Sequence, residues 1–155
     1  MRTVIVAAVV GLVCTGVTAA AQDPVQIGAA EVVAGRKAGM ALSGAAMSSI
    51  KATIDAGGPV RTQAFASGGL ARWGQAIPGM FPAGTGQGRL GAEATDAKDV
   101  IWANRADFDA KAASFATEAG KLAELARADD AAGFAAQWTV VRAGCQSCHE
   151  VYKAE

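Results

Sequence analysis

Residues 130–152 read DAAGFAAQWTVVRAGCQSCHEVY and form the last helix that the sequence predicts. Asp129 or Asp130 supplies the N-cap, because a short carboxylate side chain accepts hydrogen bonds from the first free N–H groups of a helix. Apolar and reactive side chains then recur every three or four residues, which places them on one helix face: Phe134, Trp138, Val141, Cys145, Cys148, His149 and Tyr152. The segment therefore predicts an amphipathic helix whose inward face ends in two thiols and an imidazole.

Two amphipathic helices are expected in the N-terminal half of the chain. Asp23 followed by Pro24 is an N-cap with proline at the first helical position, and it opens a helix over about residues 24–56. The sequence Gly57-Gly58-Pro59 ends that helix. A second helix is expected over about residues 59–77, with a weaker signal because a glycine pair inside it lowers the helix propensity.

A long connection and a third long helix separate these two from the C-terminal helix. Residues 78–91 are dense in proline and glycine, which break helices and strands, so they predict the connection. A short helical turn is expected over about residues 97–102. Asn104 then caps a helix whose inner stripe alternates spacings of four and three residues: Phe108, Ala112, Phe115, Ala119, Leu122 and Ala126.

Four amphipathic helices without an alternating strand pattern predict an all-α fold, an antiparallel four-helix bundle. Each apolar stripe can only be buried against its neighbours. Many inward positions are alanine or glycine, which lets helices approach closely but leaves little side-chain volume at the centre. A large flat cofactor in the core would fill that space.

Composition sets bounds on what the chain does. Its 155 residues are 52% hydrophobic and 18% charged, which supplies one compact core and excludes disorder as the main state. The 14 lysines and arginines equal the 14 acidic residues, so no broad basic field is present to hold a nucleic-acid backbone. The carboxylates are scattered rather than paired, so no hydrolytic dyad is expected and we do not expect an enzyme.

The first 21 residues have the pattern of an export signal. A positive charge at Arg2 precedes an apolar stretch, and small residues follow it up to Ala21. We expect cleavage after Ala21, a periplasmic location, no membrane anchor after cleavage, and one domain over residues 22–155. Cleavage would leave Cys145 and Cys148 as the only cysteines.

Cys145, Cys148 and His149 form the pattern Cys-x-x-Cys-His, which is typical of covalent haem attachment. On a helix the three side chains leave from one face and can meet a single rigid group. The two sulfurs would form thioethers with one haem c, and His149 would bind the iron from the proximal side through a neutral ring nitrogen. No other histidine is present in the chain.

A cofactor-free domain is the alternative interpretation of the two cysteines. A thioredoxin-like dithiol normally lies where a strand enters a helix, and no strand is predicted there. A zinc site needs a fourth ligand, and the mature chain would offer no further cysteine or histidine.

The chain resembles the class II c-type cytochromes, the cytochrome c′ and low-spin cytochrome c-556-like group. The resemblance rests on the haem motif near the C-terminus, the sequence Phe-Pro-Ala-Gly-Thr-Gly at residues 81–86 and Ile-Trp-Ala-Asn at residues 101–104. It covers essentially the whole of residues 22–155. One departure is Lys153, four residues after His149, where the family usually has arginine. Lysine keeps the charge but loses the planar guanidinium.

The resemblance implies a role for each matching residue. Cys145 and Cys148 match the attachment cysteines and His149 matches the proximal ligand. Arg36 matches an arginine near the haem edge. Met40 matches the position that faces the other side of the iron.

The resemblance implies two possible functions, and they differ in whether Met40 binds the iron. If its thioether binds the iron, the haem is low-spin and the protein carries electrons. If Met40 only packs there, the iron is five-coordinate and binds NO or CO in an apolar pocket. Met47 and Met80 are rival ligands. We favour Met40 as the distal ligand, and we therefore favour electron transfer as the function of the protein.

The expected partners follow from the same resemblance. Redox partner proteins are expected, although the sequence does not identify them. Family members are commonly dimeric through their first two helices, so a homodimer through residues 24–56 and 59–77 is expected.

Overall fold

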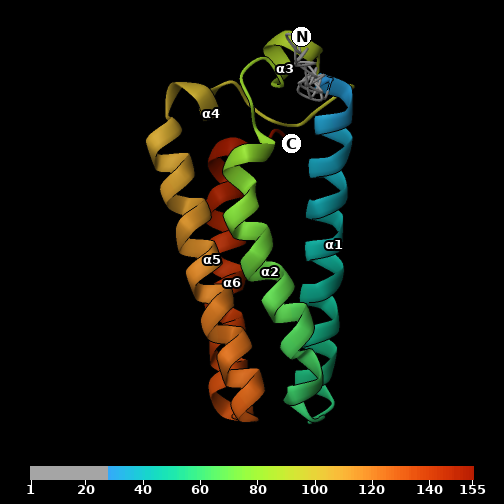
Figure 1. Ribbon diagram of the computed structural model, residues 1–155, viewed down its shortest axis with the longest axis vertical. Coiled ribbons are helices and arrows are strands. Elements are labelled where there is room, and N and C mark those ends of the chain that lie inside the picture. Colours follow the sequence, from blue (N-terminus) through green and yellow to red (C-terminus); the bar gives the residue numbers. More distant parts are fainter. Residues whose placement is uncertain (1–27) are drawn as a thin grey trace, which may run out of the picture.

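The structure, a computed structural model that describes residues 28–155, contains four long helices that run alongside one another in alternating directions (Figure 1). They are α1 (Ala29–Asp55), α2 (Ala64–Ala76), α5 (Arg105–Ala128) and α6 (Ala131–Tyr152). Within the described residues the only β-type pairing is an isolated bridge between Ala97 and Lys153. The predicted all-α, antiparallel four-helix bundle is confirmed.

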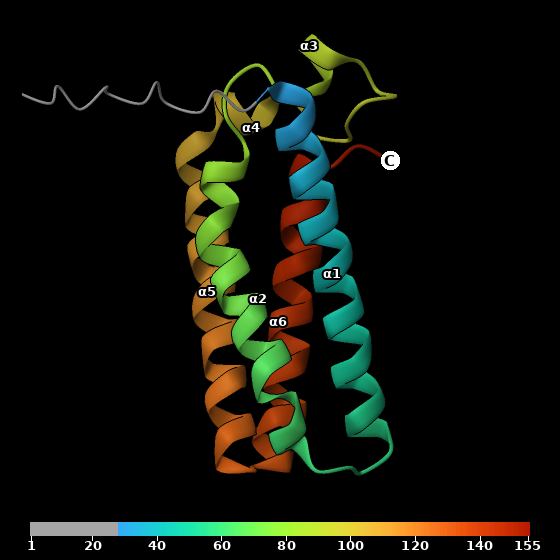
Figure 2. The same ribbon diagram turned by 45° about the vertical axis from the view of Figure 1, so that its right-hand side comes forward.

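Short elements connect the long helices. They are η1 (Val60–Gln63), η2 (Ile77–Met80), α3 (Gln87–Leu90) and α4 (Val100–Ala103). Figure 2 shows α3 and α4 together at the end of the bundle where α1 begins. The predicted connection over residues 78–91 therefore contains most of η2 and all of α3, and the predicted turn over residues 97–102 overlaps α4.

Helix ends agree with the sequence at some positions and differ at others. The predicted cap is confirmed at Asp130, whose Oδ1 accepts from the backbone N–H of Gly133 at 2.9 Å. Asn104 precedes α5 but its side chain makes no capping hydrogen bond, so the predicted capping role is wrong. Helix α1 begins at Ala29, after an extended Gly28, and thus later than expected; Asp23 lies outside the described residues.

The core consists of two apolar clusters, one at each end of the bundle. Ile50, Leu122 and Phe134 are fully buried in the cluster near the α1–α2 connection. Phe108 and Tyr152 belong to the cluster near α4. Every predicted stripe residue of α5 is buried or half-buried. Because each long helix also exposes a polar side, none of the helices in residues 28–155 has the length and apolar character needed to cross a membrane.

Candidate haem site

A cavity of about 590 Å³, here called the main cavity, holds most of the predicted site residues. Cys145, Cys148 and His149 line it from α6, and Met40 lines it from α1. Its inner wall comes from α2, η2 and α5 and is apolar: Trp73, Ile77, Phe108, Ala112 and Phe115. The structure thus brings Met40 to the same space as three predicted residues that lie more than a hundred positions later in the sequence.

A smaller cavity of about 160 Å³, the edge cavity, lies on the other side of the same residues. Four residues line both cavities: Met40, Phe108, Cys148 and His149. Arg36 lines the edge cavity only. All five residues that the sequence assigned to the site therefore lie around two adjoining spaces.

One hydrogen bond between α1 and α6 shows how the two helices are aligned along their axes. The indole Nε1 of Trp138 donates to the backbone carbonyl of Met47 at 3.2 Å. Met40 precedes Met47 by seven residues and Cys145 follows Trp138 by seven residues, and each helix rises about 1.5 Å per residue. In this antiparallel pair Met40 is therefore level with Cys145.

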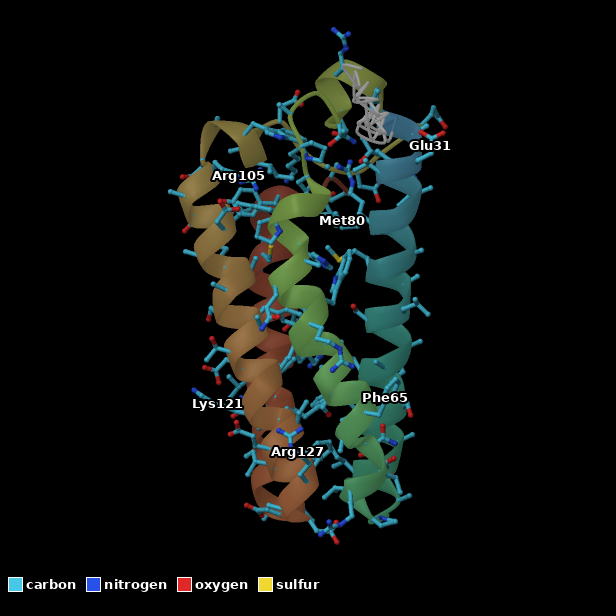
Figure 3. All side chains as sticks on the ribbon, in the orientation of Figure 1. Glu31, Phe65, Met80, Arg105, Lys121 and Arg127 are labelled. Atoms are coloured by element: carbon cyan, nitrogen blue, oxygen red, sulfur yellow. The ribbon has the colours of Figure 1, made fainter. Side chains whose placement is uncertain are left out.

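The same register separates the three methionines. Met40 lies beside the Cys-x-x-Cys-His segment and lines both cavities. Met47 lines the main cavity about 10 Å farther along α1, beside Trp138. Met80 lies in η2, at the end of α2, and lines neither cavity (Figure 3). Among the described methionines, Met40 is thus the best placed to face His149.

The two thiols lack the character of a reactive dithiol. Cys145 and Cys148 are free and half-buried, and burial raises the pKa of both thiols. A reactive or zinc-binding cysteine requires the thiolate, which a raised pKa disfavours. Within residues 28–155 no three histidine, cysteine or acidic residues come together as a metal site. Both cofactor-free interpretations therefore lack support.

His149 lies at the rim where the two cavities meet. Its ring is partly shielded, and this burial, followed by the nearby charge of Lys153, lowers the pKa of the imidazole. The ring is then neutral at neutral pH and its nitrogen lone pair is free to bind a metal. The residue as a whole is exposed, although its helical spacing predicted an inward position.

Arg36 is a buried charge without a carboxylate partner among the described residues. It is 3% exposed and donates hydrogen bonds to Thr85 Oγ1 at 2.8 Å and to Thr95 Oγ1 at 2.5 Å. Its guanidinium also donates to the Thr85 carbonyl and lies 4.5 Å from the ring centroid of Phe81. Burial lowers the pKa of this guanidinium. Neither threonine was predicted as a site residue, because nothing local in residues 78–95 indicates that they face α1.

These features fit a large flat group with an acidic edge. The main cavity is walled by aromatic and aliphatic side chains, and Arg36 supplies a positive charge at the edge cavity. The indole N–H of Trp73 is buried beside the main cavity and has no hydrogen-bond partner. Buried donors are normally paired, so this one indicates that a polar atom of a bound group belongs there. The site residues therefore fit a haem with its carboxylates.

Comparison with known proteins agrees with this fit. Cytochrome c′ of Pararhodospirillum photometricum is 29% identical over 119 residues, which cover 76% of this chain and 92% of that protein. Cytochrome c-556 of Agrobacterium tumefaciens (strain B2A) is 41% identical over 80 residues, which cover 51% of this chain and 59% of that protein.

Solved structures share the fold over the bundle. The crystal structure of cytochrome c′ from Thermochromatium tepidum superposes with a TM-score of 0.76 at 27% identity and covers 83% of this chain and 98% of its own. A cytochrome c′ with ligand-controlled dimer dissociation gives a TM-score of 0.78 at 26% identity, covering 84% and 100%. The sequence matches the Cytochrome C′ family over residues 31–153. The chain therefore belongs to the cytochrome c′ family, monohaem four-helix bundles that carry covalently attached c-type haem.

Proposed function

We propose that this protein is a periplasmic electron carrier in which His149 and Met40 bind the two sides of one haem iron. The observation that carries the proposal is that Met40 on α1 and His149 on α6 line the same two cavities from facing helices. Cys145 and Cys148, on the same helix face as His149, would hold the haem covalently.

Each residue has a distinct task in this arrangement. When bound, the haem supplies a reversible one-electron change at iron. The neutral imidazole of His149 supplies a nitrogen donor, and the two thioethers fix the ring so that this donor stays in place. Phe108 and Phe115 exclude water from the inner side. Met40 would supply a thioether donor, and methionine ligation would raise the reduction potential of the haem.

Arg36 acts at the edge of the group. Its charge is held by Thr85 and Thr95 without a carboxylate partner in the described residues, so it remains available to pair with a haem carboxylate. Such a pair would give a buried guanidinium the charged partner that it lacks, and an unpaired buried charge is costly.

The compartment and the assembly belong to the same proposal. The export pattern of residues 1–21 supports periplasmic location, and it lies outside the described residues. Leu42 on α1 and Phe65 on α2 are 71% and 84% exposed, which supports a homodimer through these two helices. The related cytochrome c′ with ligand-controlled dimer dissociation is consistent with that surface.

Paired methionine substitutions test the distal ligand. In Met40→Ala the iron should become high-spin, the far-red absorption band typical of methionine-ligated ferric haem should disappear, and the reduced protein should bind CO rapidly. Met47→Ala removes an identical thioether from the same cavity and should leave the band in place. Loss of the band only in Met47→Ala would contradict the assignment.

The alternative function is a five-coordinate NO- or CO-binding protein with Met40 not bound to iron. The apolar wall of the main cavity favours it, because small uncharged gases need no hydrogen bonds there. Rapid CO binding by the unsubstituted protein, with no methionine band, would establish this alternative. A mature protein without the added mass of a haem would exclude both functions.

A further inference from the structure

The charges of the described residues are separated between the haem cavities and the remaining surface. Six cations line the two cavities: Arg36, Lys37, Lys51, Lys111, Arg142 and Lys153. Only two carboxylates line them, those of Asp55 and Asp96. The lining therefore carries a net charge of +4, whereas the remaining described residues, with seven cations and eleven carboxylates, carry −4.

The open side of the main cavity is a groove between α1 and α6. On α1, the lining residues Gly44, Ser48 and Ala52 are exposed at four-residue spacing, and on α6 Arg142 and His149 are exposed. These residues form the two edges of the groove, opposite the buried wall of α5.

Cations line this groove and the edge cavity that adjoins it: Lys51 and Arg142 line the main cavity, and Lys37 and Lys153 line the edge cavity. Lys37 and Lys51 lie fourteen residues apart on α1, or about 21 Å along the helix. Arg142 and Lys153 lie at the α6 side. Both carboxylates of the lining are engaged by lysines, Asp55 by Lys51 at 2.5 Å and Asp96 by Lys153 at 3.7 Å. Within residues 28–155, Lys37 and Arg142 make no ion pair.

An aromatic side chain sits between two of these cations. The ring centroid of Trp138 lies 5.8 Å from Lys51 Nζ and 5.8 Å from the guanidinium carbon of Arg142. Stacking on the indole ring holds a guanidinium in place while leaving its N–H groups free to bind a carboxylate. Arg142 is thus a fixed, unpaired donor at the mouth of the haem cavity.

From this charge separation we infer that the groove between α1 and α6, with Lys51 and Arg142 at the main cavity and Lys37 and Lys153 at the adjoining edge cavity, is the docking surface for an acidic redox partner protein. The inference rests on the proposed electron-carrier function. The lining charge of +4 exceeds the two carboxylates of a haem, and although Lys111 pairs with Asp107, Lys37 and Arg142 keep the mouth positive when haem is bound. Because residues 28–155 are neutral overall, the partner is drawn by the separation of charge, which also orients the groove toward it.

Two oxidants of opposite charge test the surface in the intact haem protein. Hexacyanoferrate(III), an anion, and tris(phenanthroline)cobalt(III), a cation, each accept one electron from the reduced protein. A substitution that changes the reduction potential alters both bimolecular rate constants by about the same factor. To first order, this effect cancels in their ratio. We expect Arg142→Glu and Lys37→Glu each to lower the anion-to-cation ratio by about tenfold at low ionic strength, and added salt to reduce this effect.

Arg127→Glu is the matched control. Arg127 is exposed near the C-terminal end of α5 and lines neither cavity (Figure 3). Arg127→Glu changes the net charge by the same amount as the groove substitutions. Its anion-to-cation rate ratio should nevertheless stay within about twofold of the value for the unsubstituted protein. An equal effect of Arg127→Glu, or an unchanged ratio in both groove variants, would overturn the docking surface.

A binding measurement on the unsubstituted protein gives an independent readout. Tris(oxalato)chromate(III), a paramagnetic anion, should broaden the backbone amide signals of Lys51 and Arg142 before those of Lys121 or Arg127. Broadening centred elsewhere would contradict the proposal. The broadening does not depend on electron transfer, so it locates the anion-binding surface even if the protein reacts with neither oxidant. Failure to react with either oxidant would instead refute the electron-carrier function.

Discussion

Trp138 and Met47 form the hydrogen bond that fixes α6 against α1, with 3.2 Å between the indole Nε1 and the backbone carbonyl oxygen. The bond crosses the groove about 10 Å from the level of Met40 and Cys145. The main cavity lies between these two helices at the level of Met40, so we expect the bond to limit how far α1 can move from α6 there.

Trp138→Phe should therefore weaken both the fold and the ligation by Met40. We expect the unfolding free energy of the haem protein to fall by about 1–2 kcal/mol, because the hydrogen bond from α6 to α1 is lost and part of an aromatic ring is removed. The methionine band of the ferric protein should weaken as α1 gains freedom. Guanidinium unfolding and absorption spectra measure the two effects.

Trp102→Phe is the matched control for this change. The Trp102 Nε1 donates to the Phe81 carbonyl at 3.2 Å, and Arg105 Nη1, which donates to the same oxygen at 3.0 Å, still holds this segment when the indole N–H is removed. The expected cost is below about 1 kcal/mol, with no change in the methionine band. An equal loss of the band in both variants would show that the Trp138 bond does not control the ligand.

Local patterns predicted the parts of this molecule that local forces determine. The stripe of α5 and the cap at Asp130 follow from helix geometry and from one short side chain, and both are present. Cys145, Cys148 and His149 share one helix face, so their meeting at one cavity also follows from spacing. Met40 and Arg36 were assigned to the site only through resemblance to a family, since no spacing relates α1 to α6.

Long-range features could not be predicted in this way. Arg36 finds Thr85 and Thr95 through 49 and 59 residues of chain, part of it an irregular connection. The axial register of α1 and α6 is marked by the hydrogen bond between Trp138 and Met47, which lie 91 residues apart in the sequence. Such pairs depend on how connections place whole helices, and periodicity carries no information about that.

Gly39→Ala should disturb the distal side without touching a ligand. A Cβ at Gly39 would lie 2.4 Å from Cη2 of Trp73, and two further ring atoms lie within 2.7 Å. Overpacking of this kind costs about 1–3 kcal/mol of unfolding free energy, and relief requires α1 to move at the residue beside Met40. We expect lower stability together with a weaker methionine band.

The control for Gly39 is Gly120→Ala in α5, where nothing lies within 4 Å of the added Cβ. There the helix should gain about 0.5–1 kcal/mol, because alanine loses less backbone entropy than glycine. If Gly39→Ala were equally stabilising, the close approach of Trp73 to α1 would be wrong.

Arg36→Met should reduce stability and haem retention together. The change removes hydrogen bonds to two threonines and leaves the Thr85 carbonyl without its charged donor, for an expected loss of about 2–3 kcal/mol. Arg72→Met, on an exposed arginine of α2, should change the unfolding free energy by less than about 0.5 kcal/mol. Mass spectrometry of both variants after expression compares the fraction of chains that carry haem.

Tyr152 gives a pH dependence that can be measured separately from the haem. Its hydroxyl donates to Asp107 Oδ2 at 2.7 Å, and burial, followed by this hydrogen bond and the charge of Asp107, raises the pKa of the phenol from 10.0 to about 12. A folded-state pKa above the unfolded value means that the stabilisation is fully present below pH 10 and is lost as the pH rises toward 12.

Tyr152→Phe isolates that contribution. The variant should be less stable than the unsubstituted protein below pH 10, and the difference in unfolding free energy should shrink between pH 10 and about 12 because phenylalanine has no proton to lose. Urea unfolding at a series of pH values, with both proteins measured side by side, removes the contribution of the lysines. A difference that stays constant through pH 12, or that grows, would show that the phenol is not held protonated by Asp107.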